Sequence, residues 1–196
     1  LDARLCGPER VEVRAGETRA VLSPAPAFRG LRMILTGDEP APGDNVPATE
    51  GSDEAIDDLV GCVQVTRRLL VLFLVDESAS LKNSDPDDRR VDAAQSALDS
   101  LLALATEQGS ASPEVDVALA AFSNEFRLVQ DWTPANADTS QELRESLDSF
   151  AELKNGIDTD YVNALSDAQE SLASQAAAVT EAGGEPPCRA VVLFTD

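Results

Sequence analysis

The stretch Val71-Leu72-Phe73-Leu74-Val75-Asp76-Glu77-Ser78-Ala79-Ser80 decides the fold class of this chain. Its apolar half predicts a strand buried on both faces, because a strand with one wet face would alternate apolar and polar side chains. Its polar half then falls on the loop at the carboxyl end of that strand. In open α/β sheets this end of the strands is where ligands bind. The stretch therefore predicts an α/β sheet with a binding loop at the carboxyl end of its strands.

Three oxygen-bearing side chains stand at alternate positions of that loop, namely Asp76, Ser78 and Ser80. The spacing places them on one side of a short loop. Oxygen ligands with one negative charge between them suit a hard divalent cation such as Mg²⁺. The competing interpretation is an acid and two hydroxyls that merely cap the turn after the strand. Residues elsewhere in the chain must decide between a cation site and a turn cap.

Composition and charge exclude several classes of function. The chain has 196 residues, of which 43% are hydrophobic and 26% charged, so a folded core is expected. Its net charge of -21 repels nucleic-acid phosphates and anionic membranes. The longest apolar run, Leu69 to Val75, is far too short to span a bilayer. The absence of histidine rules out Ser-His-Asp and Cys-His nucleophiles, and we expect no enzyme.

The three cysteines, Cys6, Cys62 and Cys188, lack the spacing of metal ligands. One interpretation is a single disulfide with a leftover thiol, and a Cys6–Cys62 bond would tie the amino-terminal segment together. The other is three buried thiols in a cytosolic protein. The sequence leaves both open.

The first 66 residues predict a β-rich segment that differs from the rest of the chain. Alternating patterns on either side of a Gly-containing turn indicate a hairpin over residues 10–22. Further strands are expected at 31–35 and 62–66. Residues 37–58 are acidic and rich in Pro and Gly, which indicates a long exposed loop.

From residue 67 onward, strand and helix patterns alternate as in a doubly wound domain. The short turn between the second and third strands makes the third an antiparallel edge. The last strand ends the chain without a closing helix, so we expect a fragment of a longer protein. We predict strands at 69–75, 115–122, 126–132 and from 189. We predict one helix that begins at Pro86 behind the capping acid Asp85, a second at the capping box of Thr139 and Glu142, and a third after Asp160.

Two more oxygen-bearing side chains join the first three. Thr159 precedes a helix, and Asp196 ends a buried strand as Asp76 does. Parallel strands that flank a switch point bring their carboxyl ends side by side, so these loops can converge. Five oxygens, two of them from carboxylates, suit an octahedral cation that keeps some water. For Thr159 the alternative is a helix N-cap, a role that Asp158 or Asp160 could also fill.

Three separated strings resemble the metal-ion-dependent adhesion site of the von Willebrand factor A (vWA) family. The helix and strand between them also look like the family's first helix and second strand. The resemblance covers residues 67 to 196. The strings are Asp76-Glu77-Ser78-Ala79-Ser80, Asp158-Thr159-Asp160-Tyr161 with Ala164-Leu165, and Leu193-Phe194-Thr195-Asp196, with Arg90-Val91-Asp92-Ala93-Ala94 and Val117 to Ser123 between them.

The resemblance implies a three-layer αβα, Rossmann-like doubly wound sheet, incomplete at its carboxyl end. It implies that Ser78, Ser80 and Thr159 are hydroxyl ligands of Mg²⁺, with Mn²⁺ or Ca²⁺ as alternatives. Asp76 and Asp196 would act directly or through water. An open metal position would accept an Asp or Glu carboxylate of a partner protein, at a cell surface or in the extracellular space. Ala79 departs from the glycine that the family commonly has there.

Other interpretations of the same resemblance remain. In some adhesins a vWA domain is inserted into a β-sandwich, and the amino-terminal segment could be half of one. A cytosolic vWA subunit of an ATPase or metal chelatase complex would use the same site to dock a motor protein. A metal-dependent phosphoesterase would need a general base near the metal, and only carboxylates could serve as that base in this chain. Glu77 and Tyr161 lie beside the expected ligands, where a partner could touch them.

Overall fold

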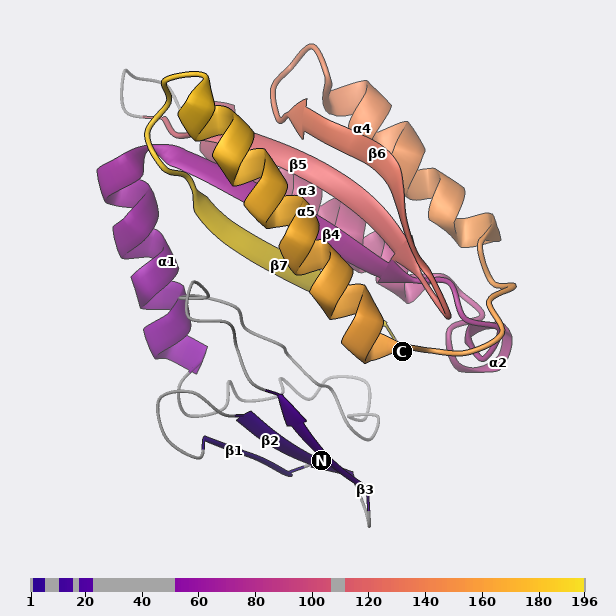
Figure 1. Ribbon diagram of the computed structural model, residues 1–196. Coiled ribbons are helices and arrows are strands. Elements are labelled where there is room, and N and C mark those ends of the chain that lie inside the picture. Colours follow the sequence, from indigo (N-terminus) through magenta and orange to yellow (C-terminus); the bar gives the residue numbers. More distant parts are fainter. Residues whose placement is uncertain (1, 6–10, 16–17, 23–51, 107–111, 196) are drawn as a thin grey trace.

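The computed structural model describes residues 2–5, 11–15, 18–22, 52–106 and 112–195. These residues form two sheets, with strand orders β1-β2-β3 and β6-β5-β4-β7 (Figure 1). In chain order the elements are β1 (Asp2–Leu5), β2 (Val11–Ala15), β3 (Thr18–Leu22), α1 (Ser52–Thr66), β4 (Arg68–Asp76), α2 (Leu81–Ser84), α3 (Arg89–Thr106), β5 (Glu114–Phe122), β6 (Phe126–Pro134), α4 (Ser140–Asp148), the 3₁₀ turn η1 (Ser149–Glu152), α5 (Tyr161–Glu181) and β7 (Cys188–Phe194).

Strand β4 lies in the interior of the larger sheet. It pairs in parallel with β5 on one side and with β7 on the other, and β6 adds to β5 in antiparallel orientation. Every residue of β4 after Arg68 is buried. This is the pattern of a strand covered on both faces, which its run of apolar residues predicts. The predicted antiparallel edge at β6 is confirmed as well.

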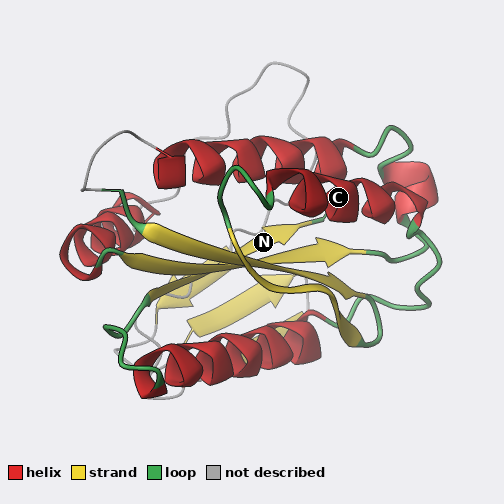
Figure 2. Ribbon diagram, turned by 90° about the horizontal axis from the view of Figure 1, so that it is seen from above, coloured by secondary structure: helices red, strands yellow, loops and turns green. Residues whose placement is uncertain are grey.

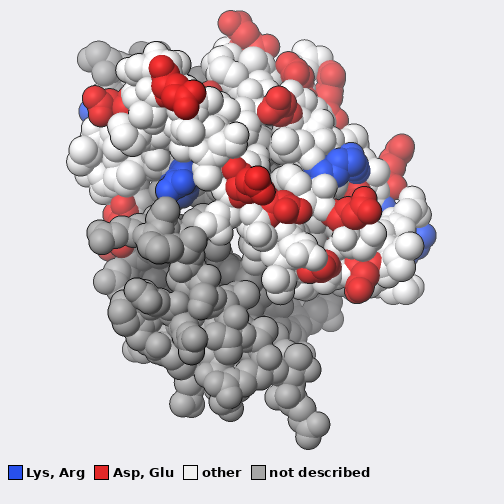
Figure 3. Space-filling view, viewed as in Figure 1, with Lys and Arg blue, Asp and Glu red and all other residues white. Residues whose placement is uncertain are grey.

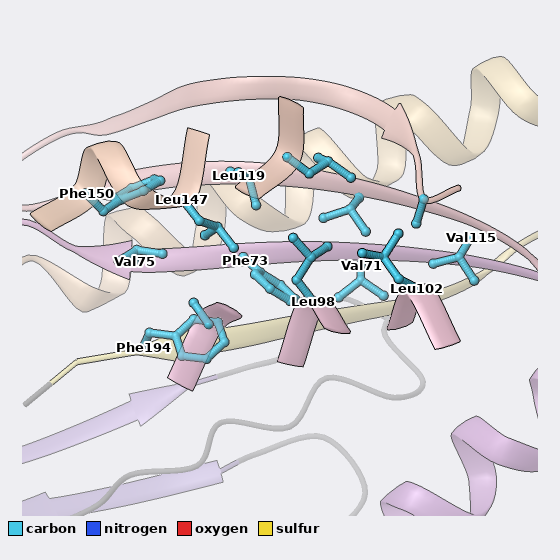
Figure 4. Close-up of a cluster of buried hydrophobic side chains, with 14 of the residues drawn as sticks. Val71, Phe73, Val75, Leu98, Leu102, Val115, Leu119, Leu147, Phe150 and Phe194 are labelled. Carbon is cyan, nitrogen blue, oxygen red and sulfur yellow. The ribbon is translucent and has the colours of Figure 1, made fainter. Parts of the chain in front are cut away.

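The side chains of β4 alternate between two hydrophobic clusters. The odd-numbered residues from Leu69 to Val75 pack against α3, α4 and part of α1, and the even-numbered residues from Leu70 to Leu74 pack against α5. Figure 2 shows the resulting layers, with helices on both faces of the sheet. In the first cluster the ring of Phe73 meets Phe194 edge-on, with ring centroids 5.1 Å apart (Figure 4). The predicted three-layer α/β architecture is confirmed.

Two predicted helix starts differ from the structure in detail. α4 begins at Ser140, but the hydroxyl of Thr139 donates to the carbonyl of Pro134 and does not cap the helix, so the capping box is wrong. α3 begins only at Arg89, after the short helix α2. Asp85 nevertheless binds the first turn of α3, because the Oδ1 atom of Asp85 accepts a 2.7 Å hydrogen bond from the backbone N–H of Arg89.

The amino-terminal hairpin is confirmed by the antiparallel pairing of β2 with β3. The strand predicted at 31–35 lies outside the described residues. The strand predicted at 62–66 is wrong, and so is the loop over residues 52–58, because both belong to helix α1. Leu59, Cys62 and Val63 have helical spacing, and all three pack against the core of the larger sheet.

A disulfide joins Cys62 of α1 to Cys188, the first residue of β7. The expected Cys6–Cys62 bond is therefore wrong, and Cys6 lies outside the described residues. The Thr66 hydroxyl lies 3.0 Å from Cys188 Sγ at the same junction. Helix α1 thus packs with the larger sheet although it precedes residue 67.

Candidate metal centre

The segment after β4, the β5–β6 turn and the loop before α5 meet at one end of the sheet (Figure 1). The N–H of Gly156 donates to the carbonyl of Glu77, and the N–H of Ala79 donates to the carbonyl of Gly156, both at 2.9 Å. The N–H of Asp160 donates to the carbonyl of Ser123 at 2.7 Å. The predicted convergence of the loops after β4 and before α5 is therefore present in the backbone.

Gly156 makes this close approach possible. A Cβ atom at this position would lie 2.2 Å from the Cβ of Ser123 and 2.6 Å from its hydroxyl oxygen. These separations are far below van der Waals contact, so no larger residue fits while the backbone bonds are kept. The loop that carries Thr159 is anchored to its neighbours by the smallest side chain available.

Asp76 is fully buried, and a donor holds each of its carboxylate oxygens. The N–H of Ser78 donates to Oδ1 and the hydroxyl of Thr195 donates to Oδ2, both at 2.7 Å. No lysine or arginine in the described part of the chain forms an ion pair with Asp76. A buried carboxylate without a positive partner is unfavourable, so a bound cation here would be stabilised.

The hydroxyls of Ser78 and Ser80 lie next to each other, with their oxygens 2.9 Å apart. Ser78 is buried and Ser80 is exposed, so the pair reaches from the buried Asp76 to the surface. Neighbouring oxygen ligands of an octahedral Mg²⁺, each about 2.0–2.1 Å from the metal, lie about 2.9 Å apart. The two hydroxyls share a hydrogen bond of this length, and the same separation would suit such a cation.

Thr159 lies on the anchored loop, between Gly156 and the first residue of α5. The N-cap of that helix is Asp160, whose carboxylate accepts from the backbone N–H of Asn163 at 3.1 Å. The Thr159 hydroxyl therefore does not cap the helix, and it forms no hydrogen bond to any described residue. Asp196, the fifth expected ligand, lies outside the described residues.

Thr195 is a site residue that sequence reasoning missed. Its hydroxyl donates to Asp76 and lies 3.2 Å from the hydroxyl of Tyr161, whose ring packs against Phe122. Thr195 belongs to the string Leu193-Phe194-Thr195-Asp196, which the sequence already connects with the site. Within that string, the sequence predicts a metal ligand at Asp196 alone. Tyr161 and Glu77 both have partners within the chain, because Glu77 accepts a 2.9 Å hydrogen bond from the guanidinium of Arg127.

A second missed feature lies directly below the loop. Arg90 donates to the backbone carbonyl of Asp76 at 3.0 Å and forms ion pairs with Asp85 and Asp88 at 3.0 and 2.8 Å. Lys154 forms an ion pair with Asp88 at 2.9 Å. Burial raises the pKa of Asp88, but the hydrogen bonds and charges of Lys154 and Arg90 outweigh burial and leave that pKa below its ordinary value. We call Arg90, Lys154, Asp85 and Asp88 the Arg90 cluster.

The described residues contain no cluster of carboxylate, thiolate or imidazole metal ligands. Within those ranges, no three His, Cys, Asp or Glu side chains come together in a way that could hold a metal, at the candidate site or elsewhere, so the candidate site depends on its hydroxyls. A hollow of about 490 Å³ is lined by Arg68 and the last turns of α5. It lies at the opposite end of the sheet, because Arg68 begins β4 and Asp76 ends it.

Solved structures that are similar to the chain include the following three. They are a von Willebrand factor type A protein from Catenulispora acidiphila (16% identity, TM-score 0.40), the PilB minor pilin from Streptococcus sanguinis (19%, 0.48) and the pilus adhesin SpaC from Lactobacillus rhamnosus GG (20%, 0.42). The matches cover 56%, 68% and 68% of this chain, and 24%, 30% and 16% of those proteins. At these identities and TM-scores, the three likenesses carry no argument about function.

None of the described helices combines the length and the apolar character needed to cross a membrane. No curated protein matches the sequence. Residues 71–196, well over half of the chain, match the von Willebrand factor type A domain. Together with the helices on both faces of a mainly parallel sheet, this match means that the chain belongs to the von Willebrand factor type A domain family.

Proposed function

We propose that the protein binds a partner protein through a Mg²⁺ ion held at the carboxyl end of β4. The observation that carries the proposal is the pair of serine hydroxyls, 2.9 Å apart, beside a buried carboxylate. The separation fits an octahedral Mg²⁺, and the cation would compensate the charge of Asp76. Ca²⁺ favours longer bonds and more ligands, so it ranks below Mg²⁺ and Mn²⁺ here.

In this proposal Ser78, Ser80 and Thr159 are hydroxyl ligands, and Asp76 and Asp196 bind directly or through water. The two hydrogen bonds already accepted by Asp76 favour a water-mediated role for that residue. A cation held mainly by neutral oxygens stays electrophilic. Its open position would therefore accept an Asp or Glu carboxylate of the partner protein, as in a metal-ion-dependent adhesion site.

We place this binding at a cell surface or in the extracellular space. The Cys62–Cys188 disulfide supports the placement, because disulfides persist in oxidising compartments and are rare in the cytosol. It disfavours the cytosolic ATPase-subunit alternative for the same reason. Acidic side chains are spread over the face shown in Figure 3, which opposes nucleic acids and anionic membranes as partners.

The metal part is tested by calorimetric titration of Mg²⁺ into the wild type, Ser80→Ala and the control Ser100→Ala. Both serines are exposed, but the Ser100 hydroxyl donates only to a carbonyl of its own helix. We expect Ser80→Ala to weaken Mg²⁺ binding by at least about tenfold, and Ser100→Ala to bind as the wild type does. Equal binding by all three proteins would refute the metal site.

The partner part is tested by selecting peptides from a random library in Mg²⁺ and eluting them with a chelator. We expect the recovered peptides to share an Asp or Glu, and the exchange of that residue for Asn or Gln to abolish binding. Recovery of peptides without a required carboxylate would refute this part. Mg²⁺-dependent hydrolysis of a phosphate ester, lost in Ser80→Ala, would instead favour the phosphoesterase alternative.

A further inference from the structure

We propose that Arg90 is a positioning residue that sets the distance between the two halves of the candidate metal site. One half is the segment Asp76 to Ser80, and the other is the loop from Lys154 to Asp160. As far as it concerns metal affinity, the inference rests on the proposed function. Its geometric part can be measured without metal.

The side chain of Arg90 is 1% exposed and contacts both the first half and the segment that leads into the second half. Its Nε donates to the carbonyl of Asp76, the last residue of β4, at 3.0 Å. Its Nη2 donates to the carbonyls of Phe150 and Leu153 at 2.7 and 3.3 Å. Leu153 directly precedes the second half. Because a guanidinium is planar and its donors are rigidly arranged, these bonds fix the spacing of the two backbones.

The charged partners of Arg90 make the same connection. Asp88 pairs with both Arg90 and Lys154, and Lys154 also donates to the carbonyl of Asp85 at 3.0 Å. Lys82 donates to the side-chain oxygen of Asn155 at 3.1 Å. Lys82 and Lys154 are the only lysines of the chain, and both link the segment after Ser80 to the loop before α5. Both lysines, together with Arg90, thus lie where the two halves are held together.

The simpler interpretation is that Arg90 only contributes to folding, as buried ion pairs do when one partner is removed. Arg68 offers a matched control. It begins β4, the strand that ends at Asp76, and pairs with Glu114 and Asp116 at 2.9 and 3.2 Å. Loss of either guanidinium should lower the stability of the fold, but only the loss of Arg90 should change the distance between the two halves of the candidate metal site.

The experiment compares the wild type, Arg90→Lys and Arg68→Lys in the full chain. The metal-free measurement is hydrogen exchange at Ala79 and Gly156, whose N–H groups form the backbone bonds between the two halves. We expect Arg90→Lys to speed exchange at both amides by about tenfold or more relative to the centre of β4, because one ammonium cannot replace the guanidinium bonds. We expect about 10–100-fold weaker Mg²⁺ binding in the same variant. Arg68→Lys should change neither value beyond its effect on global stability.

Wild-type exchange at both amides and wild-type Mg²⁺ affinity in Arg90→Lys would overturn the inference. A wild type that binds no Mg²⁺, combined with faster exchange in Arg90→Lys, would refute the proposed function and leave the positioning role standing. If Arg90→Lys unfolds in buffer, the same exchange comparison is made in an osmolyte such as TMAO, which stabilises the folded state of all three proteins. Faster exchange at Ala79 and Gly156 in Arg90→Lys under that condition would support the inference, and unchanged exchange would overturn it.

Discussion

At the scale of single residues, Gly156 and Gly61 should respond to alanine with opposite signs. A Cβ at Gly156 would collide with Ser123, whereas a Cβ at Gly61 of α1 would meet nothing within 4 Å. We expect Gly156→Ala to lower the free energy of unfolding by about 1–3 kcal/mol through overpacking. Gly61→Ala should raise it by up to about 1 kcal/mol, because alanine favours the helix. Urea unfolding measures both, and a Gly156→Ala variant as stable as the wild type would contradict the assignment of Gly156 to a close approach.

Asp88 provides a second prediction at the same scale. Because Lys154 and Arg90 hold its pKa below the ordinary value of 3.8, the unfolded state binds the proton of this carboxyl more readily than the folded state does. Its contribution to stability is therefore present above pH 3.8 and lost as the pH falls through the lower folded-state pKa. We expect wild type to be more stable than Asp88→Asn at neutral pH, and the difference to shrink in acid. Urea midpoints over a pH series test this, and a difference that does not vary with pH would contradict it.

At the scale of elements, the sequence predicted what depends on local patterns. Strand β4 followed from an uninterrupted apolar run, and α3 from the helical spacing of Val91, Leu98 and Leu102. Helix α1 was missed because the five residues from Cys62 to Thr66 alternate like a strand. Its helical pattern emerges only when Leu59 is included and the packing against the core is known.

The candidate site also combines features that local sequence patterns predict with features that they do not. The alternate spacing of Asp76, Ser78 and Ser80 predicted that the two hydroxyls lie side by side, as the structure has them. The contact of Arg90 with the carbonyl of Phe150 joins residues 60 positions apart. That of Thr195 with Asp76 joins residues 119 apart. Contacts of this kind depend on how whole elements pack, and no local pattern encodes them.

The disulfide between α1 and β7 supplies a prediction at this scale. It closes a loop of 126 positions in sequence, which restricts the unfolded chain strongly. We expect the double variant Cys62→Ser, Cys188→Ser to lose about 2–4 kcal/mol of unfolding free energy. A thiol reductant should destabilise the wild type similarly and leave the double variant unchanged. Wild type that unfolds at the same urea concentration with and without reductant would contradict the bond.

At the scale of the whole molecule, a net charge of -21 acts on every measurement with Mg²⁺. Any salt screens the mutual repulsion of the acidic side chains and stabilises the folded state. A rise in melting temperature with added MgCl₂ is therefore not by itself a sign of a specific site. The comparison must be made against NaCl of equal ionic strength.

With that comparison, the proposed site predicts a shift specific to Mg²⁺. A cation that binds only the folded state stabilises it by about 2.7 kcal/mol at a concentration of 100 times Kd, in addition to screening. Thr159→Val tests the expected ligand whose hydroxyl forms no hydrogen bond to any described residue, although its backbone N–H donates to Asp158. We expect this variant to lose most of the specific shift, whereas Thr180→Val should keep it, because the Thr180 hydroxyl donates only within its own helix. A full shift in Thr159→Val would remove Thr159 from the ligand set and leave the two serines as the hydroxyl ligands. A wild type whose melting temperature responds equally to both salts would mean that no specific site exists.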